Sequence, residues 1–425
     1  MDLAMGLGHG DAVESDGRAR ERLASAARAT GLLKATGGEN AGLVRVSSRL
    51  CLSVEHGDYN GTDLFGIGLD RYLWLAFAPN ELGIVRAFSA DFAGEGIVAF
   101  DPARVPLPTS SAAPSGWARF PLGAHFVLER SGRTCRRGFD VVIASDIPSG
   151  GMSRSAALSL ALLLATMVQN RIALPGRLEL ARLAQAIEND YTGSPCGLLD
   201  PLMIAFARAG IGVHYSPASD TVRSVDWGGA AGSLCVLSLD TGRHRHGLGT
   251  STYSIRRREC DALLSTLRQH LGVASLADAV RDDVHERAVQ CTLARHPELL
   301  PRLRYLRGAV QRFPSMVAAF ARGDAASIGS LVRKDGISLR DDYAISGPEL
   351  ETMCDLVRGL PQVHGERMLG GGDCGASGAI VDPAGAEAVR AHVEREYPLL
   401  QPAYAATFAV RECRPADGIT FLPIA

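Results

Sequence analysis

The chain has 425 residues, of which 44 are Lys or Arg and 46 are Asp or Glu, so its formal net charge at pH 7 is −2. This near-balance excludes a dedicated nucleic-acid binder, which carries a clear basic excess. The 46% hydrophobic and 21% charged content is that of a globular chain and excludes a disordered or collagen-like one.

The pattern of cysteines and apolar stretches predicts a cytoplasmic protein without a membrane partner. Nine cysteines are scattered without a CxxC pair, which is typical of reduced thiols. The longest apolar stretches, such as residues 156–167, are too short to span a bilayer, and the acidic N-terminal region shows no secretory signal.

The apolar periodicity predicts alternating groups of strands and helices. Residues 1–17 carry no regular pattern and are predicted to form a loose leader, whereas residues 18–33 show helical spacing. Strands are predicted over residues 43–52, 64–78, 141–144, 211–214, 234–239 and 405–410. Helices are predicted over residues 155–167, 178–189 and 386–394, together with a mostly helical stretch from 253 to 320.

This mixed order predicts two layered α/β domains that meet near residues 215–230. We therefore expect an N-terminal leader and helix over residues 1–40, an N-terminal domain over 41–220 and a C-terminal domain over 221–425. No internal repeat and no low-complexity linker is visible in the sequence.

The strongest local feature is PSGGMSRSAA at residues 148–157, where a predicted strand runs through a glycine and hydroxyl loop into a helix. Glycines such as Gly150 and Gly151 let the backbone approach a ligand, and the free amides of a helix N-terminus favour an anion such as phosphate. The loop is not a P-loop, because no Gly-Lys-Ser/Thr follows. An ordinary helix capped by Ser153 or Ser155 explains the pattern about as well.

Residues 48–61, SRLCLSVEHGDYNG, gather Glu55, His56 and Asp58 in one turn. Such a cluster of hydrogen-bonding groups suits the neighbouring hydroxyls of a sugar. Taken in isolation, however, a solvated Asn-Gly hairpin turn is the better interpretation.

Two further segments carry candidate chemistry. Glu188 ends a predicted helix and Asp200 follows a glycine turn, so the pair could hold Mg²⁺ and act on a hydroxyl, although two helix caps are the simpler interpretation. Residues 368–375, MLGGGDCG, contain three successive glycines before a predicted strand, which indicates a close backbone approach to a ligand or a facing loop.

Together and in this order, the segments resemble the galactokinase branch of the GHMP small-molecule kinases. SRLCLSVEHGDYNGT is similar to the family's GRVNLIGEHTDYNGG, and PSGGMSRSAA to its PxxxGLSSSAA. CGLLDP at residues 196–201 is similar to CGIMDQ, and RMLGGGDCG at residues 367–375 to RMTGGGFGG. Three more segments, starting at Trp117, Thr250 and Ser338, match in the same order, so the resemblance covers about residues 40–413.

The resemblance implies an α+β fold of the GHMP kinase type, with two α/β domains and the active site in the cleft between them. It implies an ATP- and Mg²⁺-dependent kinase that phosphorylates the anomeric hydroxyl of a galactose-type monosaccharide. Asp200 would be the catalytic carboxylate, with Arg49 opposite it, and Glu188 and Ser155 would place Mg²⁺ on the nucleotide phosphates.

The remaining site residues implied by the resemblance fall into two groups. The residues expected to bind the sugar are Glu55, His56, Asp58, Gly197 and Tyr253. The residues expected to bind the nucleotide are Trp117, Gly150, Gly151, Ser153, Ser155, Ala156, Gly371 and Gly372. We expect no nucleic-acid partner, and a monomer or weak homo-oligomer.

Several positions depart from the family pattern and leave the substrate open. Cys51, Val54 and Gly57 replace the usual Asn, Gly and Thr, the phosphate loop is one residue shorter, and Asp373-Cys374 replaces Phe-Gly. A reshaped pocket would suit another sugar, such as L-arabinose, galacturonate or a modified sugar.

The role of Arg154 and the activity itself are also open at the level of the sequence. Arg154 replaces a family serine and either adds charge near the phosphates or points to solvent. A GHMP kinase for homoserine, mevalonate or a heptose and a non-catalytic sugar and ATP sensor are the two rival functions.

Overall fold

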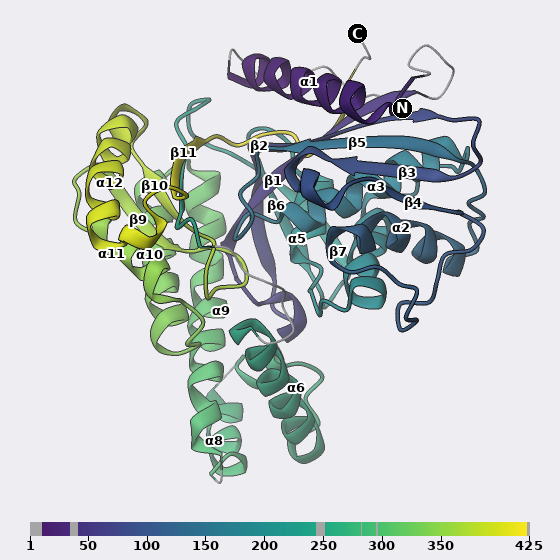
Figure 1. Cartoon of the computed structure of the whole chain (residues 1–425). Coiled ribbons are helices and arrows are strands. Elements are labelled where there is room, and N and C mark those ends of the chain that lie inside the picture. The colour runs from purple at the N-terminus through teal and green to yellow at the C-terminus, as the bar shows by residue number, and fades with distance from the viewer. Residues whose placement is uncertain (1–10, 35–40, 244–250, 282, 295, 423–425) are drawn as a thin grey trace.

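The computed structural model describes residues 11–34, 41–243, 251–281, 283–294 and 296–422, and it contains two sheets with helices packed on them (Figure 1). The first sheet has the strand order β12-β1-β2-β5-β3-β4, and the β6–β7 hairpin is attached through β2. Its strands are β1 Gly42–Ser53, β2 Leu64–Pro79, β3 Val85–Ser89, β4 Val98–Phe100, β5 Phe139–Ser145, β6 Ile211–Ser216, β7 Thr221–Asp226 and β12 Ile419–Leu422.

Helices cover both faces of this first sheet. Side chains alternate along its long central strand, so that strand contacts both layers of helices. On β2, Leu73, Leu75 and Phe77 belong to the large core that includes α3, whereas Tyr72 and Trp74 pack with α1 on the opposite face. Figure 1 shows α1 lying across one face and the other helices beneath the sheet. The helices of this part are α1 Asp11–Thr30, α2 Arg119–Arg130, α3 Arg154–Gln169, α4 Arg177–Ala186 and α5 Leu199–Phe206.

The second sheet is antiparallel throughout and has the order β11-β8-β10-β9. Its strands are β8 Cys235–Asp240, β9 Val363–Met368, β10 Ala376–Val381 and β11 Ala409–Cys413. Helices α11 Pro348–Val357 and α12 Ala386–Leu400 bury their apolar residues on one face of it.

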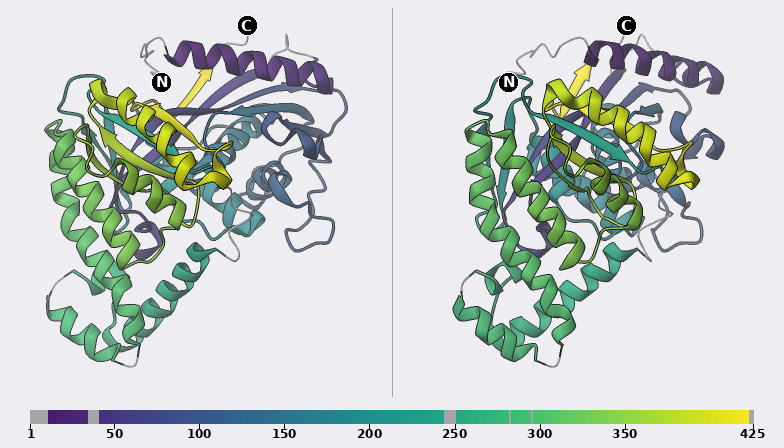
Figure 2. Two further views of the ribbon diagram at one scale, coloured as in Figure 1. Left: turned by 60° about the vertical axis from the view of Figure 1, so that its left-hand side comes forward. Right: turned by 90° about the vertical axis from the view of Figure 1, so that its left-hand side faces the viewer.

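The remaining helices follow β8 and precede α11 in the chain, and α10 contacts strands of both sheets. They are α6 Thr252–Leu271, α7 Leu276–Ala279, α8 Asp283–Thr292, α9 Leu300–Ala321 and α10 Ala325–Asp341. Helix α6 runs into an extension that it forms with α7 and α8, α9 runs from this extension back to the region between the sheets, and α10 lies beside β9 (Figures 1 and 2). In the part of the chain that the structure describes, no helix combines the length and apolarity needed to cross a membrane.

The domain division expected at residue 220 falls in the turn between β6 and β7, and both of these strands belong to the first sheet. By sheet membership the chain passes to the second sheet between β7 and β8. It then returns at its end, because β12 pairs antiparallel with β1.

Two sequence-based element predictions need correction. The loose leader expected over residues 1–17 is wrong for residues 11–17, where α1 has already begun; residues 1–10 lie outside the described residues. The carboxylate of Asp16 accepts hydrogen bonds from Arg45 and from the Trp74 indole, both at 2.7 Å, so contacts with the sheet extend the helix beyond its apolar pattern. The strand expected over residues 405–410 begins only at Ala409.

We expect Leu23→Ala to weaken the docking of α1 on the sheet. Leu23 is buried among the residues that pack α1 on the first sheet, so its truncation should cost about 2–4 kcal/mol. Hydrogen exchange of the α1 amides measures this loss. Ser25→Ala, on the exposed side of the same helix, is the control and should leave the exchange unchanged; equal exchange in the two variants would contradict the packing.

Candidate active site

A cavity of about 740 Å³ lies where the loop between β9 and β10 meets the loops of the first sheet. This volume is in the usual range for small-molecule sites. The sequence-predicted residues that line it are Arg49, Glu55, His56, Asp58, Trp117, Gly150, Gly151, Ser153, Ser155, Glu188, Gly197, Asp200, Tyr253 and Gly371. The structure therefore brings together residues separated by more than 300 positions in the sequence.

Two predicted nucleotide residues do not line the cavity. Ala156 is fully buried in the core below α3. Gly372 does not line the cavity and packs instead against the loop that contains Ile345, because a Cβ at Gly372 would lie 2.1 Å from the carbonyl oxygen of Ile345. The consecutive glycines thus serve two purposes, since Gly371 faces the cavity and Gly372 allows a close approach of two loops.

Arg49 and Asp200 form the charged centre of the cavity. The Arg49 Nε and Nη2 atoms lie 2.7 and 2.6 Å from Asp200 Oδ1. The Arg49 side chain is 2% exposed, whereas that of Asp200 is 33% exposed and faces the cavity. Burial by itself lowers the pKa of Arg49, but the carboxylates of Asp200 and Glu55 outweigh it and raise this pKa above its usual value, so the guanidinium stays charged.

The EHGDYNG segment is buried and is not a solvated hairpin, so the simpler interpretation of its sequence is wrong. Glu55 and His56 are 2% and 5% exposed. Asp58 accepts hydrogen bonds from the backbone N–H groups of Tyr59 and Leu199, each at 3.0 Å. Burial raises the pKa of Asp58, and the Leu199 N–H group partly offsets the effect.

Gly197 explains how this carboxylate reaches its place. A Cβ at Gly197 would lie 1.7 Å from Asp58 Oδ2, so only glycine leaves room for the Asp58 side chain.

Aromatic side chains from its own segment and from two distant segments surround His56. Its ring stacks on Tyr343 at 5.2 Å and lies 5.5 Å from the ring of Tyr253 in α6, and the Tyr59 hydroxyl is 3.1 Å from its Nδ1. Neither Tyr59 nor Tyr343 is among the residues predicted from the sequence to bind the sugar. Both lie inside segments that match the family pattern, which was the signal that could have identified them.

The glycine and hydroxyl loop between β5 and α3 packs backbone to backbone against the loop after β9. A Cβ at Gly150 would lie 2.7 Å from the Cα atom of Gly375, and Gly151 has a φ of +83°. These two positions require glycine for space and for backbone conformation, respectively.

Ser153 occupies the N-cap position of α3 but makes no side-chain capping bond, so its interpretation as a conventional cap is wrong. Its hydroxyl oxygen is buried and has no hydrogen-bond partner among the described residues. The first amides of α3 therefore remain available to an anion in the cavity.

Arg154 does not point to solvent, so that interpretation is wrong. Its guanidinium lies 3.0 Å from Asp91 and 5.0 Å from the centre of the Phe92 ring. Asp91 also pairs with Arg22 of α1 at 2.7 Å, and the Phe92 ring is nearly parallel to that of Trp117. Arg154, Phe92 and Trp117 all line the cavity.

Glu188 lies in a short π-helix, Ile187–Thr192, that follows α4. Cys196 donates a hydrogen bond from Sγ to Glu188 at 3.2 Å, and the Ser155 hydroxyl also bonds to this carboxylate. Among the described residues, no Arg or Lys forms an ion pair with Glu188, and burial raises its pKa to about 7.

A buried carboxylate and a hydroxyl beside the α3 N-terminus suit a magnesium ion that is held largely by nucleotide phosphates and water. The described residues contain no group of three or more His, Cys, Asp or Glu side chains that could hold a metal by themselves. The donor set of Ser155 and Glu188 therefore fits a metal brought by a nucleotide.

Comparison with known proteins identifies the family. Residues 120–208 match the GHMP kinases N terminal domain. A galactokinase from Roseiflexus sp. (strain RS-1) is 32% identical over 384 residues, which cover 89% of this chain and 92% of that protein. The chain belongs to the galactokinase family. The Bos taurus galactokinase, 30% identical over 389 residues, covers similar shares of both chains, 89% and 93%.

Solved structures confirm the GHMP kinase fold. The galactokinase of Lactococcus lactis complexed with galactose superposes with a TM-score of 0.83 at 24% identity, covering 95% of this chain and 99% of that one. A mevalonate kinase superposes with a TM-score of 0.59 at 14% identity, covering 88% and 99%. The predicted α+β class and the galactokinase-like family are both confirmed.

The buried Glu188 predicts a pH dependence of stability. In EDTA, the unfolded chain releases the Glu188 proton near its ordinary pKa of 4.5, whereas the folded protein releases it near 7. The folded protein therefore loses about 3 kcal/mol of stability as pH rises through this window. Glu188→Gln lacks the titration and should become more stable than wild type above pH 7, but not below pH 4.5.

Urea unfolding in EDTA at pH 4.5, 6 and 8 measures this difference. Glu179→Gln, an exposed position on α4, is the control and should follow wild type at every pH. Parallel stability curves for wild type and Glu188→Gln would contradict the raised pKa.

Proposed function

We propose that the protein transfers the γ-phosphoryl group of ATP to the anomeric hydroxyl of a galactose-type monosaccharide, giving the sugar 1-phosphate and ADP. One observation carries this proposal. The Arg49 guanidinium bonds to Asp200, lies 3.7 Å from Glu55 in the predicted sugar segment and donates to the Gly151 carbonyl in the phosphate loop at 3.3 Å. A single buried cation thus joins the three segments that a sugar kinase needs.

In this function Asp200 orients the anomeric hydroxyl and accepts its proton as the bond to phosphorus forms. Arg49 fixes the position of the Asp200 carboxylate and lies beside the transferring phosphoryl group. The free amides of α3, with the hydroxyl of Ser153, receive the phosphates of ATP. Phosphoryl transfer depends mainly on such positioning and on charge neutralisation.

Glu188 and Ser155 are the residues that would hold Mg²⁺. The ion, when bound with ATP, neutralises charge on the nucleotide phosphates. In the reaction, these two residues supply oxygen donors on the cavity wall beside the phosphate loop.

The sugar hydroxyls contact Glu55, His56, Asp58 and Tyr253 in this proposal, and Trp117 lines the adenine end of the cavity. Arg154 and Cys374 line the cavity, but the three departures within the sugar segment lie behind this surface. Cys51, Val54 and Gly57 do not line the cavity, and the first two are fully buried. This placement supports galactose itself over L-arabinose, galacturonate or a heptose.

A coupled ADP-release assay over a sugar panel tests the function. Galactose should give the highest kcat/KM among galactose, L-arabinose, galacturonate and glucuronate. A higher value with another sugar would reassign the substrate. Sugar binding by calorimetry without ADP release from any sugar would favour the non-catalytic sensor. We also expect the protein to be cytoplasmic and to form a monomer or weak homo-oligomer. Size-exclusion chromatography with light scattering tests the oligomeric state.

Asp200→Asn should lower kcat by about 10²-fold or more, because it removes the base while it preserves the shape of the side chain. Sugar affinity should change little. The kinase assay and calorimetry on the same variant measure the two effects. Asp190→Asn, which neutralises an exposed carboxylate in the neighbouring π-helix, is the matched control. Near-normal turnover of Asp200→Asn would show that another group acts as the base.

Arg154→Ser restores the family residue and should raise the KM for ATP by about tenfold, since a charged hydrogen-bonding group leaves the nucleotide end of the cavity. The KM for the sugar should stay unchanged. Arg182→Ser, at an exposed arginine of α4, controls for the general loss of charge. An unaltered KM for ATP would mean that the Asp91 and Phe92 contacts of Arg154 serve only packing.

A further inference from the structure

A line of buried charges runs from the catalytic centre into the second half of the molecule. It passes from Arg49 on β1 to Glu55, then to Arg367 on β9, Asp335 on α10 and Arg312 on α9. The signs alternate along the line. Four of its five side chains are no more than 5% exposed, and only Arg312, at 19%, approaches the surface. Charges so deeply buried require partners, so each one fixes the place of the next.

Arg367 is the member that joins the two halves. Its side chain is fully buried and pairs through Nη1 with Asp335. Its Nη2 atom donates to the Cys51 carbonyl oxygen at 2.5 Å and lies 3.4 Å from Glu55 Oε1. One guanidinium from the second sheet therefore binds both the backbone of β1 and the first acidic side chain of the sugar segment.

Glu55 is fixed almost entirely from outside its own segment. Its Oε1 atom accepts the Gly370 N–H group at 3.2 Å, in addition to its contacts with Arg367 and Arg49. The hydroxyl of Tyr305 on α9 donates to the Glu55 carbonyl oxygen at 2.6 Å. A shift of Arg367 would therefore move Glu55, and with it the third partner of the Arg49 guanidinium.

We infer that Arg367 is a positioning residue for the phosphoryl transfer: it transmits the placement of β9 and α10 to Glu55 and so aligns Arg49 with Asp200. The inference rests on the proposed kinase function. Arg367 does not line the cavity and contacts no substrate. It acts through Glu55, and its fork of donors, which lysine lacks, is what allows it to bind Asp335, Cys51 and Glu55 together.

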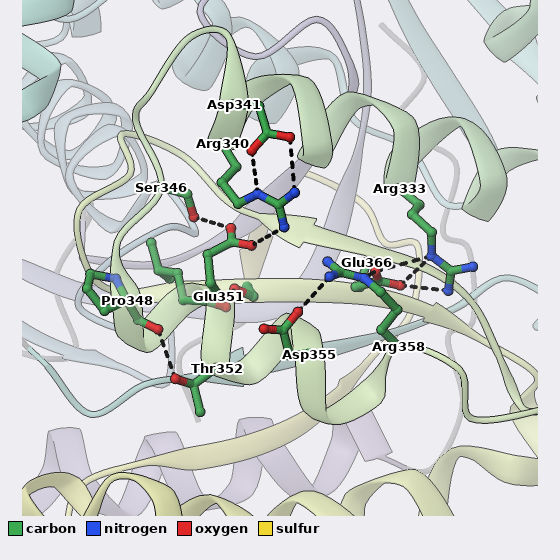
Figure 3. A network of polar contacts seen from close by, with 12 residues as sticks. Arg333, Arg340, Asp341, Ser346, Pro348, Glu351, Thr352, Asp355, Arg358 and Glu366 are labelled. Carbon is green, nitrogen blue, oxygen red and sulfur yellow. Dashed lines mark hydrogen bonds and ion pairs between the residues drawn. The ribbon is translucent and has the colours of Figure 1, made fainter.

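The adjacent residue of β9 provides a control within the protein. Glu366 has a fully buried side chain, which accepts hydrogen bonds from Arg333 at 2.7 Å and from Arg358 at 2.7 Å (Figure 3). Successive residues of a strand point to opposite faces, so Glu366 faces away from Arg367. It lines no part of the cavity, and both of its arginine partners are about one-third exposed.

The experiment compares Arg367→Lys, Arg367→Met, Asp335→Asn and Glu366→Gln with wild type. Arg367→Lys should lower kcat by about tenfold and raise the KM for galactose several-fold, since the charge stays but the fork is lost. The KM for ATP should stay within about twofold of wild type. Asp335→Asn should shift the same constants in the same direction to a smaller extent. Glu366→Gln should lower the melting temperature and leave all three constants unchanged.

The pH profile separates positioning from stability. Burial raises the pKa of Glu55 above its ordinary value, and the Asp200 carboxylate adds to this effect. Arg49, Arg367 and the Gly370 N–H group partly offset it. Arg367→Met removes one cation, so the acid limb of kcat/KM should move to higher pH. In Arg367→Lys, which keeps the charge, the limb should stay near its wild-type position. If Arg367 had only a structural role, the acid limb of kcat/KM would stay at its wild-type position in both variants.

The inference is overturned if Arg367→Lys and Asp335→Asn lose thermal stability as Glu366→Gln does but keep wild-type kcat and KM. These two variants also carry the test if Arg367→Met fails to fold. If wild type binds galactose but transfers no phosphoryl group, the kinase proposal fails. Galactose calorimetry on Arg367→Lys then decides the positioning, with unchanged affinity counting against it.

Discussion

The site depends on one buried guanidinium that must be shared. A fully buried arginine is costly unless carboxylates and carbonyl groups replace its water. Arg49 obtains these partners only when Asp200, Glu55 and the Gly151 carbonyl converge on it. Asp200, the sugar segment and the phosphate loop are thus held in their relative positions because all three contact the same guanidinium. Folding that neutralises Arg49 therefore also assembles the cavity.

A second constraint is spatial. The phosphate loop and the loop after β9 approach so closely at Gly150 and Gly375 that there is no room for a side chain on either. Backbone contact of this kind leaves little freedom for the loops to slide. The cavity can therefore be lined by segments from both sheets and still present α3 amides and the Arg49–Asp200 pair in a constant arrangement.

The sequence identified the fold class, the family and about half of the residues that line the cavity, because these depend on ordered local motifs such as EHGDYNG and CGLLDP. It could not identify the partners of those motifs. The pairing of Arg154 with Asp91, and that of Arg367 with Asp335, joins residues that no local pattern relates. The start of α1 was missed for the same reason, since contacts with the sheet through Asp16, and not apolar periodicity, support its first turns.

The pairing of β12 with β1 has a consequence for the biosynthesis of the protein. β12 closes the first sheet by pairing Leu43–Val46 of β1 with residues 419–422. A ribosome must therefore synthesise more than 370 residues after Val46 of β1 before this edge of the first sheet is covered. Until then β1 presents an unpaired edge, which is a template for association with other nascent chains. The first sheet is thus completed only after every strand of the second sheet has been synthesised.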